Sequence, residues 1–91
     1  MDTIISLQDH LDTAVFYGVN NQNILCLKNQ HPDVRVVARG YQVKVSGAEA
    51  AIARFEHSLR LCEAFCIKNN TLNEEQILML LHGEQPQEYL Q

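Results

Sequence analysis

The 91-residue sequence has no long hydrophobic run, and its aromatic, glycine and proline residues are few. A membrane-spanning helix needs roughly 18 or more apolar residues in succession, and no segment approaches that length. The opening stretch, MDTIISLQDH, lacks the basic start of a secretory signal peptide. These absences predict a cytoplasmic protein without membrane contacts.

Cysteine is also scarce, and its pattern excludes two classes of small domain. Cys26, Cys62 and Cys66 are an odd number and form no CxxC pair, which argues against a disulfide scaffold and fits a reducing compartment. A structural metal site needs four ligands at recognisable spacing, and these residues do not supply them. We therefore expect buried thiols, with no metal and no cofactor bound by this chain.

The charge distribution is more informative than the net charge of −4. Residues 1–19 carry −3 and residues 48–91 carry −4, whereas residues 20–47 carry +3. The middle third is thus a basic segment within an acidic protein, in a chain long enough for one domain. Its cations are Lys28, Arg35, Arg39 and Lys44.

The first half of the chain predicts a strand followed by a glycine turn and a helix. Residues 2–7 are short, β-branched and apolar, as in a strand, while residues 8–18 fit either a helical turn or extended chain. A helix is expected from Asn20 to about residue 30. Asn20 or Asn21 would cap it, Val19 and Ile24 would form a hydrophobic staple, and its buried face would include Leu25 and Leu27.

Residues 34–47 read as a hairpin of two alternating strands around Gly40. If Arg39 and Gly40 form the turn, Val36 faces Val43 and every matched apolar pair lies on one face. The same register places Arg35 opposite Lys44 on the other face, where two like charges oppose each other.

The second half predicts two helices. A long helix spans about 47–66, with Ser46 and Glu49 as a capping box, and a second begins at Asn73, with Gln76 as the reciprocal cap. The simplest way to bury these elements is an α+β fold in which helices pack on one face of a three-stranded sheet.

This order of elements resembles that of a KH domain, in which a G-x-x-G loop clamps the backbone of four nucleotides. The corresponding loop here is Gly18-Val19-Asn20-Asn21, and Asn21 stands where the second glycine is missing. Asparagine tolerates the left-handed conformation better than most residues. The loop therefore predicts a phosphate clamp, but it is equally consistent with a plain helix cap.

Three longer elements resemble the N-terminal region of PhoH-family proteins: FYGVNNQNI, VRVVARG and LNEEQI. The resemblance covers nearly the whole chain and implies a KH-like domain over 1–82, with 83–91 starting a linker to a missing P-loop ATPase domain. It implies that the parent protein binds ATP and Mg²⁺ and acts in RNA metabolism. The chain contains no G-x-x-x-x-G-K-[ST], so this piece is not expected to hydrolyse ATP.

Two classes of function remain open for the domain itself. The first is weak single-stranded RNA binding, with a clamp at Gly18–Asn21 and phosphate neutralisation by the basic segment. The alternative without a nucleic-acid ligand is that these long basic side chains are solvated or pair with glutamates of a neighbouring domain. The residues of this candidate site are Gly18, Val19, Asn20, Asn21, Lys28, Arg35, Arg39 and Lys44.

The second class is protein interaction, in which the domain docks on the ATPase domain, a neighbouring subunit or an RNA-processing partner. The segment ILMLL is apolar nearly all round, so the candidate contacts are Ile77, Leu78 and Leu81. An enzyme is the weakest reading. The four histidines are scattered over separate elements, and no serine lies in a nucleophile elbow.

Overall fold

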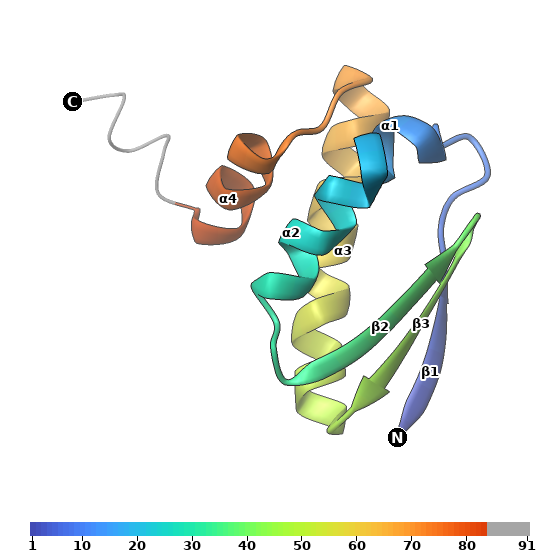
Figure 1. The fold of residues 1–91 in the computed structure, drawn as a ribbon, viewed down its shortest axis with the longest axis vertical. Coiled ribbons are helices and arrows are strands. Elements are labelled where there is room, and N and C mark those ends of the chain that lie inside the picture. The colour runs from blue at the N-terminus through green and yellow to red at the C-terminus, as the bar shows by residue number, and fades with distance from the viewer. Residues whose placement is uncertain (84–91) are drawn as a thin grey trace.

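The computed structural model describes residues 1–83, so the linker predicted over 83–91 lies outside the described residues except for Gly83. Five helical segments and three strands make up this part of the chain (Figure 1). In chain order they are β1 (Asp2–Ser6), α1 (Thr13–Tyr17), the 3-10 turn η1 (Val19–Asn21), α2 (Gln22–Asn29), β2 (Val34–Arg39), β3 (Gln42–Gly47), α3 (Glu49–Asn69) and α4 (Glu74–His82).

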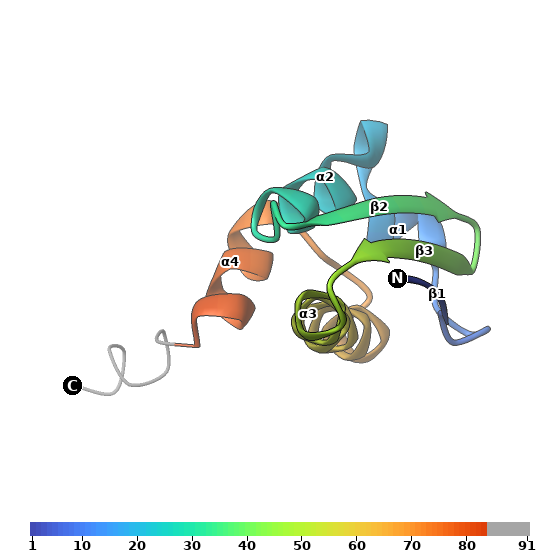
Figure 2. The same ribbon diagram turned by 90° about the horizontal axis from the view of Figure 1, so that it is seen from below.

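The three strands form one antiparallel sheet in the order β1-β3-β2. Helices α2 and α3 pack on one face, and α4 packs on those two helices (Figure 2). The core lies between the layers, where Val43 and Val45 meet Phe55 and Leu59, all without solvent exposure. The predicted α+β fold, a three-stranded sheet with helices on one face, is confirmed. No helix in residues 1–83 is long and apolar enough to cross a membrane.

The hairpin register differs from the prediction by two residues. Gly40 and Tyr41 form the turn, so Arg39 pairs with Gln42, and Arg35 lies opposite Ser46 instead of Lys44. Gly40 has a positive φ of 55° and takes the first central position, where type II′ turns require glycine. The predicted opposition of Arg35 and Lys44 is therefore wrong, because Lys44 lies between Ile4 and Val37.

Contacts made by Tyr41 hold this register in place. Its hydroxyl donates to the carbonyl of Leu11 at 3.0 Å, and its own carbonyl accepts the N–H of Leu7 at 2.8 Å. The side chain stays 43% exposed at the turn. Tyr41 thus belongs to the turn and not to the strand face on which its pattern had placed it.

The two predicted capping boxes have opposite outcomes. Asn73 and Gln76 form the reciprocal pair at the start of α4, with bonds of 2.8 and 3.0 Å, as predicted. Ser46 caps nothing, because it is still paired within the sheet and α3 begins three residues later, at Glu49. The long helix accordingly runs over 49–69 instead of 47–66.

A buried carboxylate joins α3 to the end of β1. Glu63 is 2% exposed and accepts the N–H of Gln8 at 2.8 Å. Arg60 donates to Glu63 at 3.0 Å and to the carbonyl of Ser6 at 3.0 Å. The charge of Glu63 is therefore paired and hydrogen-bonded, as a buried charge must be.

Candidate nucleic-acid interface

The predicted loop forms a tight turn between α1 and α2. Gly18 has φ 81° and ψ 173°, and Asn20 and Asn21 both take positive φ values, of 55° and 60°. The prediction that Asn21 takes the left-handed conformation in place of a second glycine is confirmed. Gly18 has a further reason to be glycine, since a Cβ there would lie 2.8 Å from Nδ2 of Asn23.

The same residues do not form the predicted helix cap. Asn21 occupies the N-cap position of α2, but no side-chain hydrogen bond closes the first turn of that helix. A capping side chain normally extends from a β-region backbone, and the left-handed backbone of Asn21 is incompatible with that geometry. Val19 is 72% exposed, so the predicted staple with Ile24 is also absent. Side-chain capping therefore does not explain the asparagines of this turn.

The turn lies in the middle of a cleft made of two hollows that share Asn21. The first, of about 430 Å³, includes Tyr17 and Gly40 among its lining residues. The second, of about 290 Å³, lies between α2 and β2 and includes Lys28. We call the two together the cleft. Its lining residues are Thr13, Ala14, Tyr17, Gly18, Val19, Asn21, Ile24, Leu25, Lys28, Val36, Val37, Ala38 and Gly40.

One side of the cleft is an edge strand. Because the sheet order is β1-β3-β2, strand β2 pairs only with β3, and α2 lies beside its other edge (Figure 1). In an antiparallel ladder, every second residue of an edge strand directs its N–H and C=O away from its partner. The cleft therefore combines apolar side chains with backbone groups that can still form hydrogen bonds.

A tyrosine closes one end of the cleft. The hydroxyl of Tyr17 donates to the carbonyl of Gly40 at 2.6 Å, which ties α1 to the tip of the hairpin. Partial burial raises the pKa of Tyr17 above its usual value, so the phenol stays protonated near neutral pH. This bond holds α1 against the tip of the hairpin at this end of the cleft.

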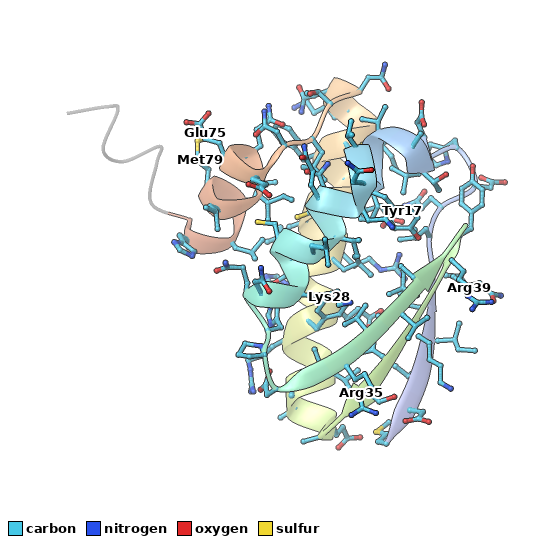
Figure 3. The ribbon with its side chains drawn as sticks, viewed as in Figure 1. Tyr17, Lys28, Arg35, Arg39, Glu75 and Met79 are labelled. Carbon is cyan, nitrogen blue, oxygen red and sulfur yellow. The ribbon has the colours of Figure 1, made fainter. Side chains whose placement is uncertain are left out.

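Leu25 lines the cleft and not the core. It was expected on the buried face of its helix, but it is 49% exposed, whereas Ile24 and Leu27 are buried. Lys28 follows one turn later on the same side of α2 (Figure 3). The helix therefore presents an apolar and a basic side chain together to the cleft.

The four predicted cations do not converge on one place. Lys28 lines the cleft, whereas Arg35, Arg39 and Lys44 point to the face of the sheet that carries no helix, called here the open face. Arg35 and Arg39 lie near the two ends of β2 (Figure 3). Within residues 1–83, none of the four cations forms an ion pair.

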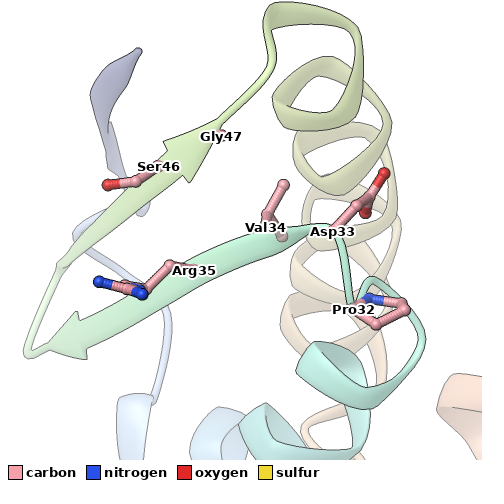
Figure 4. Close-up of a pocket in the computed structure, with 6 residues that line it drawn as sticks. All are labelled: Pro32, Asp33, Val34, Arg35, Ser46 and Gly47. Carbon is pink, nitrogen blue, oxygen red and sulfur yellow. The ribbon is translucent and has the colours of Figure 1, made fainter.

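A separate hollow lies at the open end of the hairpin. It measures about 370 Å³, and Arg35 and Ser46 lie on the same side of the two strands there (Figure 4). Gly47 allows the close approach of the neighbouring chain, since a Cβ would lie 3.1 Å from the carbonyl oxygen of Asp33. Arg35 thus belongs to a region distinct from the cleft.

The buried amide beneath the turn was not predicted from the sequence. Asn23 is 1% exposed, and its Nδ2 donates to the carbonyls of Val15 at 3.2 Å and Leu72 at 2.9 Å. Its Oδ1 has no partner, which costs about 1–3 kcal/mol for a buried acceptor. Asn23 stands in a run of amides that reads as surface, so only the packing of distant segments reveals its role.

The predicted protein-interaction residues are only partly accessible. Ile77 is 1% exposed and belongs to the core, so its assignment as a docking contact is wrong. Leu81 is half-buried against the core, while Leu78 is 36% exposed. The apolar character of ILMLL is explained mostly by the packing of α4 on α2 and α3.

The three cysteines are free and buried, as predicted. Burial raises the pKa of Cys62 to about 12, and it also raises the pKa values of Cys26 and Cys66. Thiols in this state are poor nucleophiles at neutral pH. Among the residues that the structure describes, no group of three or more side chains could hold a metal ion.

Comparisons with protein-family models, with curated proteins and with solved structures found no match. The geometry of the turn, the cleft and the sheet therefore carries the functional conclusion.

Proposed function

We propose that this chain is a non-catalytic KH-like domain that binds single-stranded RNA weakly in the cleft. The observation that carries the proposal is the turn at Gly18–Asn21, which has three positive φ values and opens on the cleft between α2 and β2. The element order and the sheet order β1-β3-β2 support a KH-like fold.

Each part of the cleft suits one part of a nucleotide. The exposed turn lets a phosphate approach the backbone closely, and Lys28 supplies positive charge one step further along. The apolar side chain of Leu25, which is 49% exposed, can receive a base, whose edge then meets the free edge of β2. A double helix does not fit this chemistry, because its bases are already stacked and paired.

The binding is expected to be weak and sensitive to salt. Lys28 is the one cation among the residues that line the cleft, and Arg39 lies next to Gly40 at its other end. Each phosphate contact contributes a slope of about −0.7 in log K against log salt for single strands. The net charge of −4 repels RNA from the rest of the surface.

Amide-shift NMR with short homopolymeric RNAs tests the proposal. We expect shifts at Gly18–Asn21 and along the cleft side of α2 and β2, which fade between about 50 and 150 mM salt. If none of these RNAs shifts the amide signals of the turn, RNA binding in the cleft is contradicted.

The proposed context is a PhoH-like cytoplasmic protein whose ATP and Mg²⁺ are bound by a separate domain. On this proposal the present domain presents RNA to that ATPase and performs no chemistry itself. Joined to such a domain, it should make ATP hydrolysis respond to single-stranded RNA. Hydrolysis that ignores RNA in the joined protein contradicts this role.

A second candidate function is protein docking through the outer side of α4. Leu78 is 36% exposed there, and the labelled Glu75 and Met79 lie on the side turned away from the sheet (Figure 3). An Asp substitution of Leu78 should weaken association with the parent ATPase domain or an RNA-processing partner. RNA affinity should not change, because Leu78 lies outside the cleft.

A further inference from the structure

The side chain of Asn23 connects three segments of the chain. Its Nδ2 donates to Val15, which belongs to α1 before the turn, and to Leu72, which directly precedes the N-cap of α4. Asn23 itself lies in the first turn of α2. The start of α4 is therefore one side chain away from the turn at Gly18.

The turn rests directly on this amide. A Cβ at Gly18 would lie 2.8 Å from Nδ2 and 2.9 Å from Cγ of Asn23, so the backbone of Gly18 packs closely against this amide. Beneath them, Leu72 and Ile77 face Phe16 across an interior gap that has no room for a water molecule. Residues of α1, α2 and α4 therefore enclose Asn23 in one closely packed region.

The buried amide of Asn23 has both a cost and a gain. Its Oδ1 is buried without a partner, whereas an apolar residue in its place would leave the carbonyls of Val15 and Leu72 without this donor. An unpaired buried group in a native structure calls for another reason. The two carbonyls that Asn23 holds together supply that reason.

We propose that Asn23 is a positioning residue that couples RNA binding in the cleft to the docking of α4. The inference rests on the proposed function. A phosphate backbone that settles on the turn acts on Gly18 and, through Asn23, on Leu72. A change in the docking of α4 acts on the turn by the same path. The free energy by which RNA binding favours α4 docking must equal the free energy by which α4 docking favours RNA binding.

The first test loosens α4 without touching the cleft. Asn73→Ala removes the capping box of α4 at an exposed residue, and RNA affinity should fall by about fivefold, the lower end of typical coupling. Asn69→Ala is the matched control, because it removes an exposed asparagine that bonds only to Phe65 at 3.1 Å. The control should bind short homopolymeric RNA as the unchanged chain does.

The second test follows amide shifts on addition of the same RNAs. Shifts at the turn together with shifts over residues 72–81 support the coupling. In Asn23→Ser, the shifts at the turn should remain and those over residues 72–81 should disappear. Should Asn23→Ser fail to fold, the difference in RNA affinity between Asn73→Ala and Asn69→Ala tests the coupling by itself.

The outcomes separate the two proposals. Shifts at the turn that stop before Leu72, together with unchanged affinity of Asn73→Ala, overturn the coupling and leave RNA binding intact. An absence of shifts at the turn overturns RNA binding in the cleft and the coupling with it.

Discussion

The cleft beside β2 and the open face of the sheet have similar side chains and different backbones. Each presents a lysine and an exposed aliphatic residue, Lys28 with Leu25 in the cleft and Lys44 with Ile4 on the open face. The cleft is concave and reaches both the turn at Gly18 and the free edge of β2. On the open face, Lys44 lies on the central strand, which is paired along both edges.

On the proposed function, positive charge alone is not enough to identify the nucleic-acid site. The sequence pattern predicts repulsion between Arg35 and Lys44 on the hairpin face, and the observed register removes that repulsion. The cleft combines a concave shape, the free edge of β2 and Lys28 with the turn at Gly18. The following changes test this contrast, from the largest expected effect to the smallest.

Gly18→Ala should have the largest effect. The combination of φ 81° and ψ 173° is essentially restricted to glycine and costs other residues about 1–3 kcal/mol, to which the contact with Asn23 adds. We expect the free energy of unfolding in urea to fall by at least about 2 kcal/mol, with loss of RNA binding. Gly40→Ala also strains a backbone of positive φ but meets no atom within 4 Å, so its cost should be smaller than that of Gly18→Ala. Equal losses of unfolding free energy in the two variants would mean that the close packing of Gly18 against Asn23 is unimportant.

A pair of aspartate substitutions compares the two surfaces directly. Leu25→Asp places a carboxylate in the cleft, where it repels phosphate, and should weaken RNA binding about tenfold. Ile4→Asp makes the same change on the open face, and affinity should change by less than about twofold. Both side chains are well exposed, so stability should move by only about 0.5 kcal/mol. Fluorescence anisotropy with labelled RNA measures both, and a larger effect of Ile4→Asp would favour the open face.

The smallest effect concerns pH. Burial, with a lesser contribution from Arg54, lowers the pKa of His31 below its usual value, although Asp33 opposes the shift. His31 therefore binds a proton more readily in the unfolded chain than in the folded one. The contribution of neutral His31 to the free energy of unfolding is present above about pH 6.5 and is lost as pH falls through the folded pKa. His31→Gln should flatten the pH dependence of unfolding, while His57→Gln, at an exposed position, should not.

RNA affinity should not follow this titration. No histidine is among the residues that line the cleft, and the raised pKa of Tyr17 keeps its phenol protonated over the range in which His31 titrates. A parallel fall of affinity and stability over that range would point to a histidine in the RNA site.

Local patterns in the sequence predicted the elements but not always their partners. The alternating hairpin was recognised, but both registers keep the apolar residues on one face, so a period of two cannot separate them. The hydrogen bonds of Tyr41 with Leu7 and Leu11 select the observed register. The capping motif at Ser46 failed for a similar reason, since pairing with Asp2 keeps that residue in the sheet.

The candidate site was predictable in part. A glycine followed by amides before a helix indicated an unusual turn, and its positive φ values agree. The cleft itself could not be foreseen, because it needs α2 beside the edge of β2, and that arrangement follows from sheet order. Asn23 was hidden for the same reason: its partners lie 8 and 49 residues away in the chain.

The most direct measurement compares the RNA affinities of Lys28→Glu and Lys44→Glu at about 50 mM salt, where phosphate contacts are strongest. Both variants change net charge equally, and only Lys28 lines the cleft. Binding in the cleft predicts a loss of about tenfold or more for Lys28→Glu and of no more than about threefold for Lys44→Glu. Equal losses, or a larger loss for Lys44→Glu, would contradict the cleft as the RNA site.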